Sequence, residues 1–313
     1  MSVEFVLVIN PRAGERQRKN RFLIPRLREM ASTAGLLVEV DRLEALEPSL
    51  ERALTQQPRF VAVFGGDGSI HHVVDRLVKI VGRGDLPALL PLGGGTMNCF
   101  VSDLGYRMAA DLLLERVAEE EGGFEERGLL VLEDDRTGQK RYGFTFGNGL
   151  VYEGLQEYAR RPPSAINGAR VIAGGLFMPH LRERYTALHP MRVELDGKPH
   201  PSKSFLGILS SSLAASVLGF RPYAGPLADR SRQFSLLATS YSLKELIPLA
   251  PAVLWGRGRL SLNADFYTNQ VIEEARLGFS RGYTLDGETF SVEGEASMTL
   301  RVDRIVRIPR PRS

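Results

Sequence analysis

A glycine-rich segment, Gly65–Ser69 (GGDGS), stands directly between an apolar run and an expected helix. The run is Phe60–Phe64 (FVAVF), and the helix is expected over Ile70–Val81. Phosphate oxygens need several N–H donors at close range, and glycines let the backbone approach without a Cβ atom and adopt a positive φ. The N-terminus of the following helix adds N–H groups and a positive dipole end. The pattern predicts a turn that binds the phosphates of a nucleotide, with a plain tight turn as the alternative.

Three side chains in and beside this segment carry chemistry of their own. Asp67 has two open interpretations: its carboxylate could hold Mg²⁺ near the phosphates, directly or through water, or it could brace the turn through a hydrogen bond. Ser69 could cap the helix or donate its hydroxyl proton to a phosphate. His71 could approach the phosphates, although a packing or surface role is the simpler prediction.

Two further turns follow apolar runs in the same way. Gly93–Thr96 (GGGT) follows the run Ala88–Leu92, precedes another expected helix, and has the polar residue Asn98 just beyond it. Asn10–Gly14 (NPRAG) is a weaker signal that supplies an amide and a cation after the first apolar run. The carboxyl ends of strands in an open α/β sheet meet at one crevice. We therefore expect the two glycine turns to face the same crevice and the Asn10–Gly14 turn to lie at the same edge of the sheet.

The elements that position these turns follow from the hydrophobic pattern. In about the first 120 residues, apolar runs alternate with amphipathic segments, which is typical of a parallel sheet covered by helices. After Gly122 the pattern changes to short runs separated by turn dipeptides such as Asp196-Gly197 and Asp286-Gly287, which is typical of a β-rich domain. The fold class expected is an open α/β domain over residues 1–122 and a sandwich-like β domain over 123–296, with segment 297–313 able to return to the first. The main predicted strands are Val3–Ile9, Leu36–Val40, Phe60–Phe64, Ala88–Leu92, Met191–Leu195, Ser204–Leu209, Gln233–Thr239 and Val271–Leu277, and the other predicted helices are Arg18–Ala34, Leu46–Gln56, Arg107–Glu121, Ile166–Leu181 and Leu243–Leu254.

The composition and charge of the chain indicate which broad class of protein it belongs to. Hydrophobic residues make up 43% of the 313 residues and charged residues 25%, which is ordinary for a globular chain. The net charge is +3, and no basic stripe is interleaved with aromatic residues, so a nucleic-acid partner is not expected. With one cysteine, no signal-peptide pattern and no apolar run near the ~18 residues of a membrane span, we expect a soluble cytoplasmic protein.

Four segments in this order and spacing resemble the diacylglycerol kinase-like lipid kinase family, which includes bacterial lipid kinases and the sphingosine and ceramide kinases. They are Asn10-Pro11 with Gly14, Gly65–Ser69, Pro91–Asn98 (PLGGGTMN) and Tyr283–Glu288 (YTLDGE). The resemblance spans most of the chain, and its motifs are concentrated in about the first 100 residues.

The resemblance implies a nucleotide-binding α/β domain of the NAD kinase/diacylglycerol kinase type, a β-sandwich domain, and ATP and Mg²⁺ as cofactors. It implies that Glu288, beside Asp286, accepts the proton of a lipid hydroxyl, and that Asp67 serves catalysis and the metal. A lipid substrate would be met transiently at a membrane surface, and a homodimer is compatible with the sequence. The residues implied to bind the nucleotide are Asn10, Gly14, Gly65, Gly66, Asp67, Gly68, Ser69, Ile70, His71, Gly94, Gly95, Thr96 and Asn98.

The sequence departs from the family pattern at three places. Cys99 stands where lipid kinases often carry aspartate, Asp41 and Arg42 follow the second strand where a hydroxyl residue is common, and Ser231-Arg232 replaces an acidic pair. A structural metal site built by other members near that pair is therefore doubtful here. Two alternatives stay open: a phosphotransferase like the NAD kinases, which share the GGDG turn, and a regulatory nucleotide- or lipid-binding protein that has lost catalysis.

Overall fold

The computed structural model of the chain describes residues 3–12, 20–39, 42–95, 98–119, 122–160, 187–214, 221–223, 225–249 and 262–312. The chain divides into two compact units. The α/β unit comprises Met1–Arg127 and Ile305–Ser313, and the β unit comprises Gly128–Arg304. The predicted boundaries at 122 and 296 lie at the starts of two long strands, β5 (Phe124–Asp134) and β17 (Ala296–Pro309), whereas the structure divides the units within these strands.

The α/β unit is built on a parallel sheet, as predicted, and its four strands have the order β2-β1-β3-β4. All residues of β1 and β3 are buried, as expected for continuous apolar runs covered on both faces. Ile9 pairs with Phe64, and Gly65 pairs with Gly93, so the carboxyl ends of three strands lie level. The strands are β1 (Phe5–Ile9), β2 (Gly35–Glu39), β3 (Phe60–Gly65) and β4 (Ala88–Gly93).

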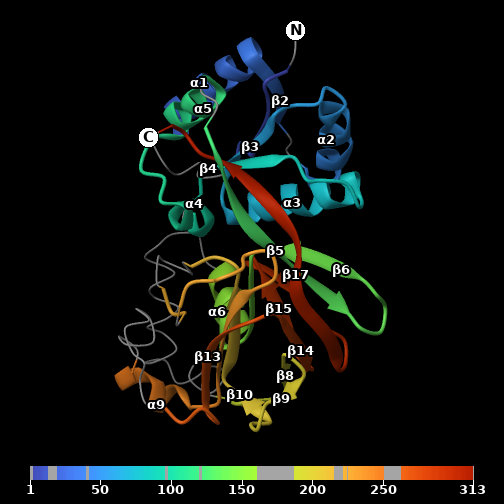
Figure 1. The fold of residues 1–313 in the computed structure, drawn as a ribbon, viewed down its shortest axis with the longest axis vertical. Coiled ribbons are helices and arrows are strands. Elements are labelled where there is room, and N and C mark those ends of the chain that lie inside the picture. The colour runs from blue at the N-terminus through green and yellow to red at the C-terminus, as the bar shows by residue number, and fades with distance from the viewer. Residues whose placement is uncertain are drawn as a thin grey trace. The chain divides into compact units, whose positions relative to one another are not determined.

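Helices cover both faces of this sheet (Figure 1). Apolar residues of α1 and α5 share one core cluster with β1, β3 and β4, and α2 packs beside α3. The helices are α1 (Asn20–Ala34), the short 3-10 turn η1 (Leu43–Ala45), α2 (Leu46–Leu54), α3 (Asp67–Val81), α4 (Cys99–Leu104) and α5 (Ala110–Glu119).

The β unit contains two antiparallel sheets that enclose one apolar core, which confirms the predicted sandwich. The first sheet has the order β10-β8-β14-β17-β5-β6, with β9 beside β8, and the second has the order β13-β12-β11-β7-β15-β16. The strands other than β5 and β17 are β6 (Lys140–Gly143), β7 (Thr145–Gly149), β8 (His189–Leu195), β9 (Lys198–Pro199), β10 (Ser204–Phe205), β11 (Gly207–Ser211), β12 (Phe234–Thr239), β13 (Tyr267–Ile272), β14 (Glu274–Phe279), β15 (Tyr283–Leu285) and β16 (Glu288–Phe290).

Helical segments of this unit are α6 (Leu150–Ala159), α9 (Leu243–Leu246) and the 3-10 turn η3 (Ile247–Leu249). The predicted helix over 166–181 lies outside the described residues, as does the end of the helix predicted from Leu243. No helix within the described ranges is both long and apolar enough to cross a membrane.

Two predicted strands were wrong, because each is divided between the two sheets. The run Ser204–Leu209 was expected to be continuous, but the chain leaves β10 at Phe205 and enters β11, in the other sheet, at Gly207. The run Val271–Leu277 was expected to be continuous, but the chain leaves β13 at Ile272 and enters β14, in the other sheet, at Glu274. The Asp196 side chain stabilises this crossing, because its Oδ1 accepts hydrogen bonds from the Glu273 and Glu274 amides, each at 2.9 Å. The apolar pattern does not reveal the break because both halves face the same core.

The Asp286-Gly287 dipeptide forms the two-residue turn between β15 and β16. Leu285 pairs with Glu288 across the turn, and φ is +51° at Asp286 and +89° at Gly287, as a type I′ turn requires. Asp286 Oδ1 accepts hydrogen bonds from the Phe144 and Thr145 amides, each at 2.8 Å. The turn thereby anchors β15 and β16 to the start of β7.

We predict that Asp286→Ala lowers the free energy of unfolding by about 2 kcal/mol, because it leaves two amides without their acceptor. Asp286→Asn keeps a side-chain oxygen at this place and should cost less than half as much. Urea denaturation of both variants measures the difference. An alanine variant as stable as the wild type would contradict the anchoring role.

Candidate functional site

The N-terminus of α3 presents backbone amides at the carboxyl end of β3. Gly66 is the extended N-cap residue, with φ −90° and ψ −176°, and the first bond of the helix runs from the Ile70 amide to the Gly66 carbonyl at 3.2 Å. The helix thus begins at Asp67, three residues before the predicted start. Among the described residues, the Gly68 and Ser69 amides have no hydrogen-bond partner. Unsatisfied amides at a helix N-terminus, together with the helix dipole, favour binding of an anion.

Asn10 ties the first strand to this helix end. Its Nδ2 donates to Ser69 Oγ at 2.9 Å, and its own amide donates to the Phe64 carbonyl at 3.1 Å. Because the Ser69 hydroxyl accepts from Asn10, it keeps its own proton for a further acceptor. Asn10 and Ser69, two of the residues assigned to the nucleotide, therefore lie in contact, whereas Gly14 lies outside the described residues.

The second glycine turn packs directly against the first. The Gly65 carbonyl accepts hydrogen bonds from the Gly94 amide at 2.9 Å and the Gly95 amide at 3.1 Å. Asn98, with φ +48°, closes the second turn, because its Oδ1 accepts from the Gly95 amide at 2.9 Å and its Nδ2 donates to the Gly95 carbonyl at 2.8 Å. The Gly94 and Gly95 amides, which sequence reasoning assigned to phosphates, therefore hold the two turns together in this structure.

This contact explains why the second turn needs glycine. A Cβ atom at Gly95 would lie 2.4 Å from the Gly66 Cα, closer than any side chain can approach. At Gly93, in contrast, the nearest atom to such a Cβ would be Asn98 Nδ2 at 3.4 Å, an ordinary contact. Thr96 lies outside the described residues.

A buried asparagine that sequence reasoning missed supports the second turn. Asn20, at the start of α1, is 2% exposed, and its Nδ2 donates to the Gly94 carbonyl at 3.0 Å. The only feature of the sequence that could have identified Asn20 is its spacing, because it lies on the same face of α1 as the buried Leu27 and Ala31.

The Asp67 side chain accepts hydrogen bonds from the first amides of α4. Its Oδ2 accepts from the Cys99 amide at 3.0 Å, and its Oδ1 accepts from the Phe100 amide at 3.1 Å. The carboxylate therefore caps α4, where it is favoured by the unsatisfied amides and the dipole. Ile70 and His71, with exposures of 2% and 4%, have buried side chains. The described residues contain no group of three or more His, Cys, Asp and Glu that could hold a metal ion, and metal binding by Asp67 stays a prediction.

Asp286 and Glu288 belong to the β unit. Asp286 forms the turn described above, and Glu288 is the half-buried first residue of β16. The Asp196-Gly197 turn has the same construction, with φ +47° and +75° and a carboxylate that accepts from two amides. The hydrogen bonds of Asp286 are thus those of an anchored turn, and they assign no catalytic role by themselves.

Comparison with known proteins agrees with this geometry. Residues 4–122 match the model of the diacylglycerol kinase catalytic domain, and no curated protein matches the chain.

The likeness of fold extends over the whole chain. Three solved structures from Bacillus anthracis str. Sterne, each assigned as a diacylglycerol kinase, are similar to it. The first has 14% identity and a TM-score of 0.70, with 98% of this chain and 96% of that chain covered. The second has 12% identity, a TM-score of 0.65 and the same coverage, and the third has 14% identity, a TM-score of 0.66 and coverage of 98% and 97%. At this identity the likeness concerns the fold.

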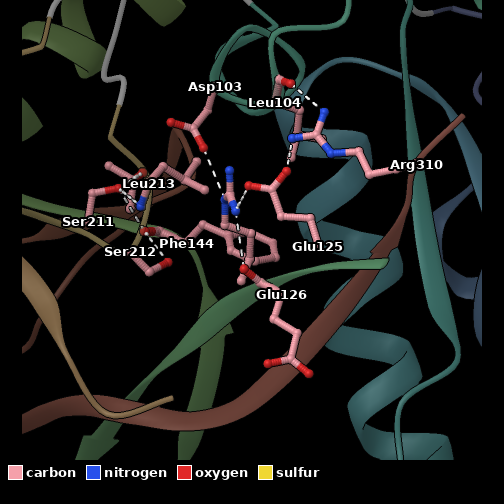
Figure 2. A network of polar contacts seen from close by, with 11 residues as sticks. Asp103, Leu104, Glu125, Glu126, Phe144, Ser211, Ser212, Leu213 and Arg310 are labelled. Carbon is pink, nitrogen blue, oxygen red and sulfur yellow. Dashed lines mark hydrogen bonds and ion pairs between the residues drawn. The ribbon is translucent and has the colours of Figure 1, made fainter. Parts of the chain in front are cut away.

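An ionic network holds the C-terminal end of α4 in the α/β unit (Figure 2). The Arg127 Nε lies 3.1 Å from Asp103 Oδ2, and these side chains are only 4% and 2% exposed. Arg127 also pairs with Glu125, which in turn pairs with Arg310, and Arg310 Nη1 donates to the Leu104 carbonyl at 2.7 Å. Helix α4 is therefore bound at one end by Asp67 and at the other by this network.

Tyr106 continues the network towards the C-terminus. Its hydroxyl donates to the Pro309 carbonyl at 2.8 Å, and the Arg310 guanidinium carbon lies 5.1 Å from its ring centroid. Burial raises the pKa of Tyr106 to about 12, with Arg310 and Arg127 opposing the rise, so the hydroxyl keeps the proton that it donates. Residues 305–313 are thus held within the α/β unit.

We predict that Gly95→Ala costs about 1–3 kcal/mol of stability, because the added Cβ forces the two turns apart. Gly93→Ala, in the same segment, should change the free energy of unfolding by less than about 0.5 kcal/mol. Urea denaturation of the two variants provides the test. Equal stability of both would show that the turns are not in close contact.

We predict that Arg127→Met costs about 3–5 kcal/mol, because Asp103 then loses its buried cationic partner. The double variant Arg127→Met/Asp103→Leu should recover part of this loss. Arg28→Met, which breaks an exposed pair with Glu39, should cost less than about 1 kcal/mol. If Arg127→Met were no worse than Arg28→Met, α4 would not depend on the network.

Proposed function

We propose that this chain is a kinase that transfers the γ-phosphate of ATP to the hydroxyl group of a lipid of the diacylglycerol or sphingoid type. One observation carries the proposal: the Gly68 and Ser69 amides, which have no partner among the described residues, stand at a helix N-terminus inside the segment that matches the diacylglycerol kinase catalytic domain. The name given to the structural relatives supports a lipid acceptor.

The α3 N-terminus fits the phosphates of a nucleotide. The Gly68 and Ser69 amides, the Ser69 hydroxyl proton and the positive end of the helix dipole are directed to one place, and each favours an anionic oxygen. Gly65, Gly66, Gly94 and Gly95 contribute indirectly, since their close packing keeps side chains away from this helix end. Phosphoryl transfer relies mainly on positioning and on electrostatic stabilisation, which such a rigid set of donors supplies.

Mg²⁺ is proposed to bind at the same place, with Asp67 as the carboxylate that would hold it. Both Asp67 oxygens accept an amide hydrogen bond, and a carboxylate oxygen can accept from more than one donor, including a water molecule. Magnesium in phosphate sites commonly keeps several waters and uses one or two carboxylates together with the phosphates. Bound Mg²⁺ would offset the negative charge of the triphosphate, and Asp67 would hold it through water while it caps α4.

Glu288 is the proposed proton acceptor for the lipid hydroxyl. A carboxylate within hydrogen-bond reach of an attacking hydroxyl can remove its proton as the phosphoryl group moves. Asp286 anchors the turn that carries Glu288 and would act as a positioning residue. Because a lipid acceptor resides in a membrane, the reaction requires a transient, peripheral encounter of a cytoplasmic protein with the membrane surface.

We predict that radiolabelled γ-phosphate is transferred from ATP to one lipid alcohol of a panel in mixed micelles with Mg²⁺. Glu288→Gln should lower kcat by about 10²–10⁴-fold, because it removes the base. Its Kd for ATP should stay unchanged, because ATP is held by other residues. Glu295→Gln is the matched control, since Glu295 is an exposed carboxylate of the same unit that pairs with Arg192.

Other outcomes of this assay would overturn the proposal in distinct ways. Phosphorylation of NAD in place of any lipid would make the chain an NAD kinase-like enzyme. ATP binding without transfer to lipid or NAD would make it a nucleotide-binding regulatory protein. Full activity of Glu288→Gln would keep the kinase but remove the proposed base.

A further inference from the structure

A cavity of about 500 Å³ lies at the open edge of the β sandwich. Strands β6 and β16 are the last strands of their two sheets, and residues of both line the cavity. The Arg141 guanidinium carbon, from β6, lies 4.4 Å from the ring centroid of Phe290, from β16, so the two edges approach each other at this place. The volume is within the range of about 300–1,000 Å³ that is typical of small-molecule sites.

The floor of the cavity is the apolar core itself. Leu132, Tyr283 and Met298 are 1%, 4% and 7% exposed, and all three belong to the core cluster enclosed by the two sheets. Phe290 and Val292 pack against the same cluster and are partly buried. The Tyr283 and Phe290 rings are stacked, with centroids 5.2 Å apart. A ligand that entered the cavity would therefore meet apolar side chains beneath it.

The rim, in contrast, is rich in hydrogen-bond donors. Arg136, Gln139 and Arg141 come from the β5–β6 hairpin, and Thr289 and Ser291 come from the opposite edge. Arg141 is half-buried and forms no ion pair with any carboxylate in the described ranges, because its contacts are the Phe290 ring and the Tyr283 hydroxyl. A guanidinium in such a place is a strong donor for a carboxylate or phosphate.

Two carboxylates also line the cavity and limit where an anion could bind. Asp134 is directed at its own turn, because its Oδ1 accepts from the Arg136 amide at 2.8 Å and the Thr137 amide at 3.1 Å. Glu293 is exposed on the opposite rim. An anion is therefore favoured at Arg141, above the stacked rings, rather than across the whole mouth.

We propose that this cavity binds an anionic single-chain amphiphile, with its acidic head group at Arg141 and its first apolar carbons over Tyr283 and Met298. The shared chemistry is an acidic head on an alkyl chain, which phosphate monoesters and fatty carboxylates both supply. None of the residues that line the cavity belongs to the proposed nucleotide site, so the inference stands apart from the proposed function.

Isothermal titration of the full-length protein tests this proposal with dodecyl phosphate below its micellar concentration. We expect one binding site for dodecyl phosphate per chain. Laurate, which carries a carboxylate head group in place of the phosphate, should bind with similar or weaker affinity, and the difference in affinity measures the preference for a phosphate. Dodecyl trimethylammonium should bind at least tenfold more weakly than dodecyl phosphate. Equal binding of this cation, or no binding of dodecyl phosphate, would overturn the proposal.

Variants locate the site. Arg141→Met should weaken binding of dodecyl phosphate at least tenfold, while Arg141→Lys should retain part of the affinity. Thr289→Trp is a second variant for the case in which Arg141 is needed for folding. Thr289 is an exposed residue that lines the cavity, so the larger side chain should fill the cavity mouth without a change of charge. This variant should abolish binding of dodecyl phosphate. Arg276→Met, an exposed arginine of the same unit that pairs with Glu274, is the control and should bind as the wild type. Undiminished binding by a folded Thr289→Trp variant would place the amphiphile elsewhere and contradict the inference.

Discussion

The hydrogen bonds from the Gly94 and Gly95 amides to the Gly65 carbonyl are the interaction on which the candidate site depends. They are possible because β3 and β4 end level, with Gly65 paired to Gly93. The second turn then lies so close to Gly66 that only glycine fits at position 95. The two turns form one rigid platform, which leaves the Gly68 and Ser69 amides as the donors directed outward.

Three aspartates accept hydrogen bonds from backbone amides, one beside this platform and two in the β unit. Asp67 accepts from two amides of α4, Asp286 accepts from two amides at the start of β7, and Asp196 accepts from two amides where the chain crosses between sheets. A carboxylate that accepts two amide hydrogen bonds stabilises its turn whether or not a ligand is present. Loss of activity in a variant at Asp67 or Asp286 would therefore report on folding as well as on catalysis. Glu288 is the more informative position, because it is the proposed base and lies in β16, beyond the turn that Asp286 anchors.

The sequence predicted the parallel sheet well, because strands covered on both faces are continuous apolar runs bounded by glycine turns. It also placed the Asn10 turn at the same sheet edge as the glycine turns, but it did not predict the hydrogen bond that joins Asn10 to Ser69. It could not predict which amides of the glycine turns are engaged, because their acceptor, the Gly65 carbonyl, depends on the register of two strands. The crossing at Glu273 was missed because apolar residues on both sides face one core.

Two further features could not be predicted from the sequence, because they also depend on contacts between distant parts of the chain. The pair Arg127–Asp103 joins residues 24 positions apart in sequence, and nothing in their local pattern distinguishes them from surface charges. The cavity at Arg141 exists only because two edge strands from different sheets approach each other. Both features depend on tertiary pairing rather than on local propensity.

Amide NMR of the protein labelled with [¹⁵N]glycine and [¹⁵N]serine, titrated with ATP and Mg²⁺, tests most directly whether the α3 N-terminus binds the phosphates. We expect large shifts of the Gly68 and Ser69 amide resonances as ATP binds. We also expect the Gly94 and Gly95 amides to stay protected from hydrogen exchange, because they remain bonded to the Gly65 carbonyl. Saturable ATP binding that leaves the Gly68 and Ser69 resonances unmoved would show that the phosphates bind elsewhere.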